Sequence, residues 1–147
     1  MNYITLLEAN TYFLTRLSTG AWDDSNNNDR EASLTMGTEI IDRLNYRGEK
    51  HDDAQVNQFP RGDDIAVPDD IKKACAEIAL ALLDGVDPEL EFANLNMSSQ
   101  AYANIKSTYD RGRPPEHILA GVPSVSAWRY LKPFLRDPYG VSLNRVS

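Results

Sequence analysis

The stretch from Val67 to Gly85 constrains the fold more than any other part of the chain. Between Ala74 and Leu83 its only polar side chain is Glu77. Apolar residues recur there at helical spacing in two adjacent stripes. A helix that is apolar around most of its circumference must be surrounded by other elements. We therefore predict that this stretch is the central helix of the domain. The core residues that we predict are Ile71, Cys75, Ile78 and Leu82 from this helix and Trp128 from a later one.

The two ends of this helix carry recognisable signals. Pro68 suits the first helical position, where a missing N–H costs nothing. Asp69 and Asp70 follow in the first turn, where the helix dipole favours negative charge. Gly85 suits the left-handed position just after a helix. We predict that the helix begins at Pro68 and ends near Asp84.

Length and composition indicate one globular domain. A chain of 147 residues matches the usual size of a single domain. No apolar run approaches the length of a membrane span, and the N-terminus lacks the pattern of a signal peptide. We therefore expect no membrane partner. The single cysteine, Cys75, can make no internal disulfide.

The charge is distributed unevenly along the chain. Residues 1–94 hold 8 Lys and Arg against 19 Asp and Glu, a net charge of −11. Residues 95–147 hold 7 against 3, a net charge of +4. An acidic body argues against nonspecific nucleic-acid binding, which needs a basic surface to displace counterions. The basic end can dock against an acidic surface of another subunit.

Local signals predict further helices. Thr5 and Glu8 form a capping box, so a helix should begin just after Thr5. Asn28 or Asp29 can cap a second helix that should end near 46–48. Gly37 lies in the middle of that helix, where glycine lowers helix stability by about 1 kcal/mol relative to alanine. A close crossing with another helix would explain a glycine at this position. The stripes that we predict to be buried are Leu6, Ala9, Phe13 and Leu17 in the first helix and Met36, Ile40 and Leu44 in the second.

In the second half of the chain the sequence predicts short helices together with extended segments. A short helical turn should follow Asp87, and Ser124 can cap a last helix that Pro133 shortens. Residues 95–110 alternate like a β-hairpin, and two strands alone need a partner surface. The predicted fold is mainly α: a small bundle of about four helices in residues 1–135, a β-hairpin near 95–110 and an extended tail at 136–147. The connections at 21–28, 48–66 and 110–123 are expected to be loops, anchored by Trp22 in the first and by Phe59-Pro60 in the second.

The sequence offers little for catalysis. Only His51 and His117 are present, and His51-Asp52 lacks the further ligands of a metal hydrolase. The paired aspartates lack the spacing of a calcium loop. There is no glycine-rich phosphate loop, nucleophile elbow or zinc spacing. We therefore expect no enzyme activity, no catalytic residue, no metal and no cofactor.

Several stretches together resemble a known family. They are YITLLEANTYFLTRL, GTEIIDRLNYRGEK, FPRGD, VPDDIKKACAEIALALLDG, AYANIKSTYD and AWRYLKPFL. In this order they resemble phage head–tail connector proteins, also called adaptor or head-completion proteins. Related sequences are often labelled DnaT-like single-stranded-DNA-binding proteins. The resemblance covers almost the whole chain.

The resemblance implies a structural role in the virion, at the head–tail junction, after assembly in the host cytoplasm. It implies a ring of about twelve copies below the portal of a tailed double-stranded DNA phage. The implied partners are the portal protein, a tail or tail-completion protein, and double-stranded DNA that passes through the lumen without specific binding. The implied portal-docking residues are Arg136, Pro138, Tyr139, Val141, Leu143, Arg145 and Val146. The hairpin residues expected to contact a neighbouring subunit are Met97, Tyr102, Ile105, Lys106 and Tyr109.

The alternative is a single-stranded-DNA-binding, DnaT-like replication accessory protein. Single-strand binders need a basic groove with stacking aromatic side chains. This chain is acidic, and its aromatic residues lie mostly at positions that indicate a core. An acidic lumen instead suits a DNA conduit, because it holds the duplex off the wall. The sequence therefore favours the adaptor.

Overall fold

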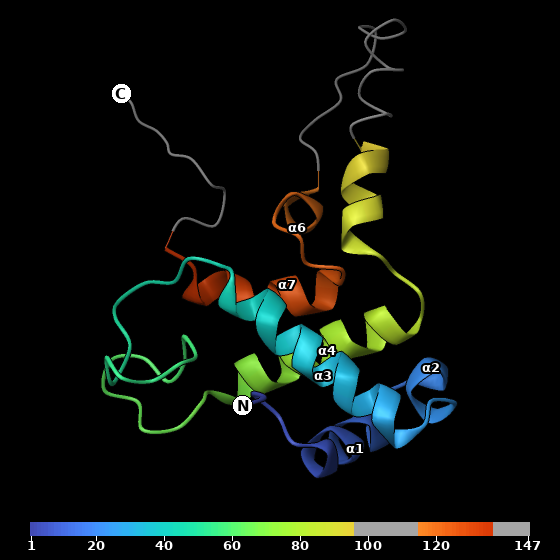
Figure 1. The fold of residues 1–147 in the computed structure, drawn as a ribbon, viewed down its shortest axis with the longest axis horizontal. Coiled ribbons are helices and arrows are strands. Elements are labelled where there is room, and N and C mark those ends of the chain that lie inside the picture. The colour runs from blue at the N-terminus through green and yellow to red at the C-terminus, as the bar shows by residue number, and fades with distance from the viewer. Residues whose placement is uncertain (96–114, 137–147) are drawn as a thin grey trace, which may run out of the picture.

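The computed structural model describes residues 1–95 and 115–136, and this part is mainly α-helical (Figure 1). Besides the helices named below, residues 88–95 form a helical segment. Within the described ranges there are no named strands, only two isolated bridges. The helices are α1 (Leu6–Leu14), α2 (Gly20–Asp23), α3 (Asn27–Asp42), α4 (Asp69–Leu83), α6 (Glu116–Leu119) and α7 (Val125–Leu131), followed by the 3-10 turn η2 (Lys132–Phe134).

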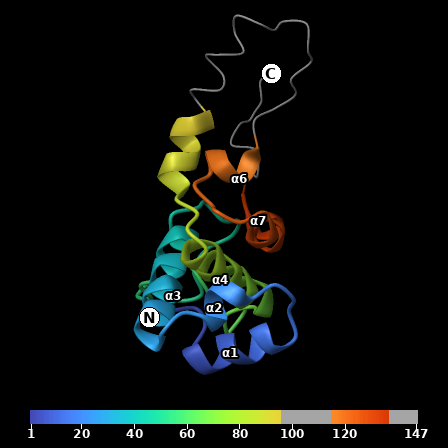
Figure 2. The same ribbon diagram turned by 90° about the vertical axis from the view of Figure 1, so that its right-hand side faces the viewer.

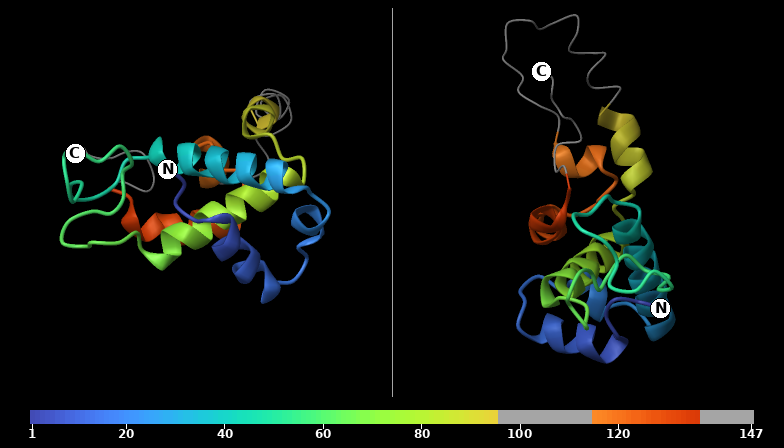
Figure 3. Two further views of the ribbon diagram at one scale, coloured as in Figure 1. Left: turned by 60° about the horizontal axis from the view of Figure 1, so that its bottom comes forward. Right: turned by 90° about the vertical axis from the view of Figure 1, so that its left-hand side faces the viewer.

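Helix α4 lies at the centre of the domain. It packs most extensively against α3 and α7 and also touches α1 and α2. Figures 1 and 3 show α3 alongside α4, with α7 and α1 covering other sides. Three of the predicted core residues of α4, Ile71, Cys75 and Ile78, are fully buried. Trp128 on α7 is buried as well, whereas Leu82 is only half-buried because it borders an open groove.

The start of α4 differs by one position from the prediction. Pro68 is the N-cap, with an extended backbone (ψ 146°), and Asp69 is the first helical residue. Asp69 and Asp70 do lie in the first turn, as predicted. At the other end the chain leaves the helix after Leu83, and Gly85 adopts a positive φ of 94°. That conformation is left-handed and favours glycine.

Two of the predicted helix caps are confirmed. The Thr5 hydroxyl accepts a hydrogen bond from the Glu8 amide at 3.1 Å, and the Glu8 carboxylate accepts one from the Thr5 amide at 3.0 Å. Ser124 caps α7 by accepting from the Ala127 amide at 3.1 Å. Helix α7 ends at Leu131, before Pro133, as that proline predicts.

The predicted ends of α3 are wrong. Its N-cap is Asn26, whose side chain accepts from the Asp29 amide at 2.8 Å. The helix ends at Asp42 rather than near residues 46–48. The cause is tertiary: Tyr46 turns into the core, and its hydroxyl donates to the Ile41 carbonyl at 2.6 Å.

Two short helices lie where loops were predicted. Helix α2 starts one residue before the predicted loop at 21–28 and overlaps its first three residues. It carries Trp22, which is buried as expected and donates to Asn10 at 2.9 Å. Helix α6 falls within the predicted connector at 110–123. Glu116 fixes it to α7 by accepting from the Trp128 indole at 3.1 Å and pairing with Lys132 at 3.1 Å.

Two members of the predicted buried stripes are exposed. Leu17 is 87% exposed because α1 ends at Leu14, so the helical spacing does not continue to it. Met36 is 49% exposed because it lies on α3 at the border of an open groove. The other stripe residues are buried or half-buried.

The β-hairpin predicted at 95–110 lies almost wholly outside the described residues. Leu95, its first residue, belongs to the helical segment 88–95, so the predicted start is wrong. The hairpin residues Met97, Tyr102, Ile105, Lys106 and Tyr109 lie outside the described ranges. The same holds for the predicted tail residues Pro138, Tyr139, Val141, Leu143, Arg145 and Val146, and only Arg136 is described.

Gly37 lies at a close helix crossing, as predicted. A Cβ atom added there would lie 3.1 Å from the Cys75 carbonyl oxygen and 3.3 Å from its Sγ. We expect Gly37→Leu to lower the free energy of unfolding by about 2 kcal/mol, because overpacking would push α3 away from α4. Thermal melts should show this loss. Gly20→Leu is the matched control, since a Cβ there meets nothing within 4 Å. Equal melting temperatures for both variants would contradict the crossing.

Candidate interaction surfaces

The two histidines lie in separate parts of the structure. The Nδ1 atom of His51 is 2.8 Å from the Gly62 carbonyl oxygen, so this ring holds a loop together. His117 lies on α6, where partial burial lowers its pKa against the opposing effect of Glu91. Within the described ranges, no group of three or more His, Cys, Asp or Glu residues could hold a metal ion. None of the helices described there is both long and apolar enough to span a membrane.

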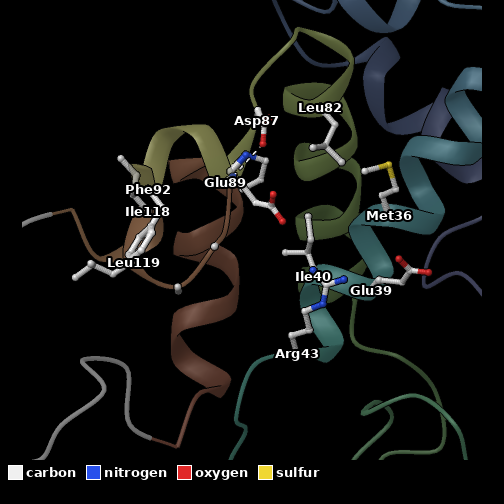
Figure 4. A pocket seen from close by; sticks show the side chains of 13 residues that line it. Met36, Glu39, Ile40, Arg43, Leu82, Asp87, Glu89, Phe92, Ile118 and Leu119 are labelled. Carbon is white, nitrogen blue, oxygen red and sulfur yellow. Dashed lines mark hydrogen bonds between the residues drawn. The ribbon is translucent and has the colours of Figure 1, made fainter. Parts of the chain in front are cut away.

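An open groove of about 550 Å³ lies on the described part of the domain. Its walls come from α3, the last turn of α4, the helical segment 88–95 and α6 with the turn after it. Figure 4 shows the side chains of these four elements around the opening. The apolar side chains that line it are Met36, Ile40, Leu82, Phe92, Ile118 and Leu119.

The groove exists because the chain turns sharply after α4. The Val86 amide donates back to the Ala81 carbonyl at 3.1 Å, and Gly85 supplies the left-handed conformation. Asp87 then opens the next helical segment by accepting from the Glu89 amide at 3.0 Å. In Figure 2 this segment rises from the end of α4 beside α6. Leu82 and Met36 are therefore left without a covering helix.

The charged residues around the groove are mainly acidic. Glu39, Asp87 and Glu89 contribute three carboxylates, and Arg43 contributes one guanidinium. An apolar floor with an acidic border suits an apolar segment whose flanks are neutral or cationic. Sequence reasoning missed this groove, because its lining residues come from four separate stretches of chain.

A second apolar surface lies on and just after α1. Leu7, Leu14 and Leu17 are 75%, 84% and 87% exposed. Leu7 and Leu14 are seven residues apart, about two helical turns, and so project from the same side. We call these three residues the leucine ridge. Single exposed leucines are ordinary on protein surfaces, but a cluster of this kind typically marks an interaction site.

A buried ion pair fixes α1 to α4. The Glu77 carboxylate, on α4, is 4% exposed and accepts from Arg16 at 2.7 Å and 2.9 Å. The Tyr12 hydroxyl donates to the same carboxylate at 2.5 Å. Burial and the neighbouring carboxylate raise the pKa of Tyr12, and the hydrogen bond to Glu77 raises that of Arg16. The pair therefore holds the helix that carries the leucine ridge.

The connection between α3 and α4 is anchored by aromatic residues. Phe59 is buried, as predicted, and packs edge-on against Tyr3, Tyr46 and Phe134. Arg61 donates to the carbonyl oxygens of Arg47 at 2.9 Å and Gly48 at 2.6 Å, as well as to Gln58. The guanidinium of Arg61 is therefore used within the loop.

The same loop fixes the point where residue 136 leaves the domain. The Arg47 amide donates to the Phe134 carbonyl at 2.9 Å, and the Arg136 amide donates to the Asn45 carbonyl at 3.1 Å. Leu135 is buried between these two bonds. Arg136, the one predicted docking residue in the described part, is exposed. The predicted tail thus starts from an anchored position.

The thiol of Cys75 belongs to the core. Burial raises the pKa of this thiol to about 11, and its Sγ donates to the Leu34 carbonyl at 3.4 Å. A thiolate is the reactive form of cysteine. At neutral pH Cys75 is therefore a packing residue.

One family model matches this chain. It is described as "Putative DnaT-like ssDNA binding protein", and it covers residues 2–143. No curated protein and no solved structure matches the chain.

Proposed function

The chain belongs to the "Putative DnaT-like ssDNA binding protein" family, and we propose that it is a structural adaptor of a tailed double-stranded DNA phage. In this role it forms a ring under the portal, joins the head to the tail and continues the DNA channel. The proposal draws on the sequence resemblance to head–tail connectors and on the surface of the described residues. It involves no catalytic step.

The observation that carries the proposal is the charge of the described surface. Residues 1–95 and 115–136 hold 11 Lys and Arg against 20 Asp and Glu, a net charge of −9. Nucleic-acid affinity depends on cations that replace the counterions of phosphates. A body that is this acidic repels phosphates, which suits a wall past which DNA must slide.

Most of these cations already have partners inside the protein. Arg16 pairs with Glu77, and Lys72 pairs with Glu8 at 2.8 Å. Lys132 pairs with Glu116. The cations that donate to backbone carbonyls are Arg30, Arg47, Lys50 and Arg61. Moving these side chains to phosphates would break contacts that hold the fold together.

The remaining parts of the adaptor proposal concern its partners. The exposed Arg136 and the segment after it would dock on the portal protein, and the opposite face of the ring would meet the tail or a tail-completion protein. A segment this short cannot bury Tyr139, Val141 and Leu143 against itself, so a partner that orders it would cover them at modest affinity. A ring would multiply a modest affinity for each copy. The site of action would be the virion, after assembly in the host cytoplasm.

A second candidate function, single-stranded-DNA binding as a replication accessory protein, is favoured by the family description. It is also favoured by one stretch of sequence. Lys106, Arg111 and Arg113 alternate with Tyr102 and Tyr109, and basic residues interleaved with aromatic ones are typical of single-strand binding. On this hypothesis the stretch 101–113, rather than the acidic body, would bind the DNA.

One titration separates the two functions. We expect the purified chain to bind a fluorescent oligothymidylate only weakly at physiological salt, with no saturation in the submicromolar range. The matched variant replaces Lys106, Arg111 and Arg113 with alanine and should behave like the wild type. Submicromolar, salt-sensitive binding that this variant loses would replace the adaptor with the single-strand binder.

A second experiment tests the adaptor function directly, with portal rings of the same phage. The full chain should add to them as a ring that mass measurement and electron microscopy detect, and deletion of 137–147 should abolish the addition while leaving the thermal melt unchanged. Addition of the truncated chain at the wild-type level would mean that another surface docks on the portal.

A further inference from the structure

We propose that copies of this chain associate head to tail, with the leucine ridge of one copy packed into the groove of the next. This inference deepens the proposed function, because it names the contact between subunits from which a ring would be built. The occupant of the groove is thus a second copy of this chain.

The two surfaces complement each other in shape and polarity. The leucine ridge projects from the domain, since its three side chains are 75–87% exposed. The groove is recessed, with a volume of about 550 Å³ that can accept several such side chains. Each surface is apolar and lacks a covering element in the described part of the chain. Packing one into the other removes both from water, which is the main source of favourable free energy in association.

The charges around the two surfaces are compatible. Glu8 is the only charged residue in α1, and it is paired with Lys72 at 2.8 Å. Leu14 shares a hollow with Arg16, Asp23 and Arg30, and Arg16 is paired with Glu77, so the surroundings of the ridge carry no excess of negative charge. The border of the groove carries Glu39, Asp87 and Glu89 against Arg43. Docking therefore brings no excess of negative charge against the acidic border of the groove.

The positions of the two surfaces require a head-to-tail arrangement. Figures 1 and 2 show α1 on one side of the α3–α4 pair and α6, with the segment 88–95, on the other side. A contact between different patches of identical subunits is heterologous. Such a contact repeats from copy to copy and makes a closed ring when the rotation between neighbours closes. A symmetric dimer would instead use the same patch on both copies.

Two surface variants test this pairing. Leu14→Glu places a charge on the ridge and leaves the groove intact. Met36→Glu does the reverse, since Met36 lines the groove and is 49% exposed. Ile65→Glu is the matched control, because Ile65 is 86% exposed and lies outside both surfaces. Thermal melts should show that all three variants keep the wild-type fold.

The readout is sedimentation velocity of the full chain from micromolar to near-millimolar concentration. The wild type and the Ile65→Glu control should form oligomers larger than dimers, while Leu14→Glu and Met36→Glu should each stay monomeric. An equimolar mixture of these two variants should stop at a 1:1 dimer. Each such pair has one intact ridge and one intact groove, and the contact between the two chains uses both, so assembly cannot continue.

Other outcomes overturn the inference. A mixture that stays monomeric while the wild type assembles would exclude the ridge-to-groove contact, and a dimer of Met36→Glu alone would indicate a symmetric ridge-to-ridge contact. A wild type that is monomeric at every concentration would also overturn it. The adaptor function is tested separately with portal rings, so its failure can be distinguished from these results.

Discussion

Replacing Ile78 with aspartate is expected to unfold the domain. Ile78 lies in the middle of α4 and is 0% exposed, with α3, α7, α1 and α2 packed around its helix. An isolated carboxylate in such a place loses its hydration and gains no partner. The cost should exceed about 4 kcal/mol, the range of the most damaging single substitutions. Native domains are stable by only about 5–15 kcal/mol, so little or no stability would remain.

Circular dichroism during heating and in urea measures this effect. The matched control is Ile65→Asp, because Ile65 is 86% exposed and the same change of side chain there should leave the melt within error of the wild type. The Ile78→Asp chain should be insoluble or lack a cooperative transition. A cooperative melt at the wild-type temperature would mean that α4 is not the centre of the core.

Removing the cation of the buried ion pair is the second large effect. In the Arg16→Met variant the Glu77 carboxylate keeps Tyr12 but loses both guanidinium contacts, at 2.7 Å and 2.9 Å. Breaking a buried pair from one side leaves an uncompensated charge and costs about 3 kcal/mol. Arg16 is partly exposed, at 29%, so water moderates the loss. Urea denaturation should show the midpoint moving to lower urea with the slope unchanged.

The double variant Arg16→Met with Glu77→Leu distinguishes the charge from the packing. With both charges removed, the site can be filled by apolar side chains, and such replacements are often neutral. We expect the double variant to regain most of the stability that Arg16→Met loses. The cycle also needs the single variant Glu77→Leu. If the loss in the double variant equals the sum of the losses in Arg16→Met and Glu77→Leu, the pair is not coupled.

The ion pair also connects stability to the proposed assembly. Tyr12 and Arg16 hold α1 on α4, and α1 carries two of the three residues of the leucine ridge. A loosened α1 would present these leucines at variable positions, so Arg16→Met should weaken self-association as well as stability. Leu14→Glu, in contrast, should weaken self-association alone.

The features predicted correctly from sequence are those that neighbouring residues decide. The capping box at Thr5 and Glu8 and the cap at Ser124 need partners only three residues away. Helix α4 was recognisable because its apolar residues repeat over fifteen positions. Gly37 indicated a close crossing because glycine in mid-helix has a cost that only tight packing offsets.

The errors occurred where a distant contact overrode the local pattern. Helix α3 stops at Asp42 because Tyr46 packs in a cluster with Phe59, which lies thirteen residues further along the same connection. Helices α2 and α6 have four residues each, too few to show a period, and each depends on a contact of a buried tryptophan. Leu17 continued the spacing of α1 in the sequence, but the helix had already ended.

The sequence by itself determined the class of fold, the central helix and the acidic character of the body, because composition and short-range periodicity are properties of the chain alone. The tertiary structure alone decided the groove and the pairing of Arg16 with Glu77. The groove needs four stretches of chain to meet, and the ion pair joins residues 61 positions apart. Local sequence carries no information on such contacts, since they are set by how separate helices pack around α4.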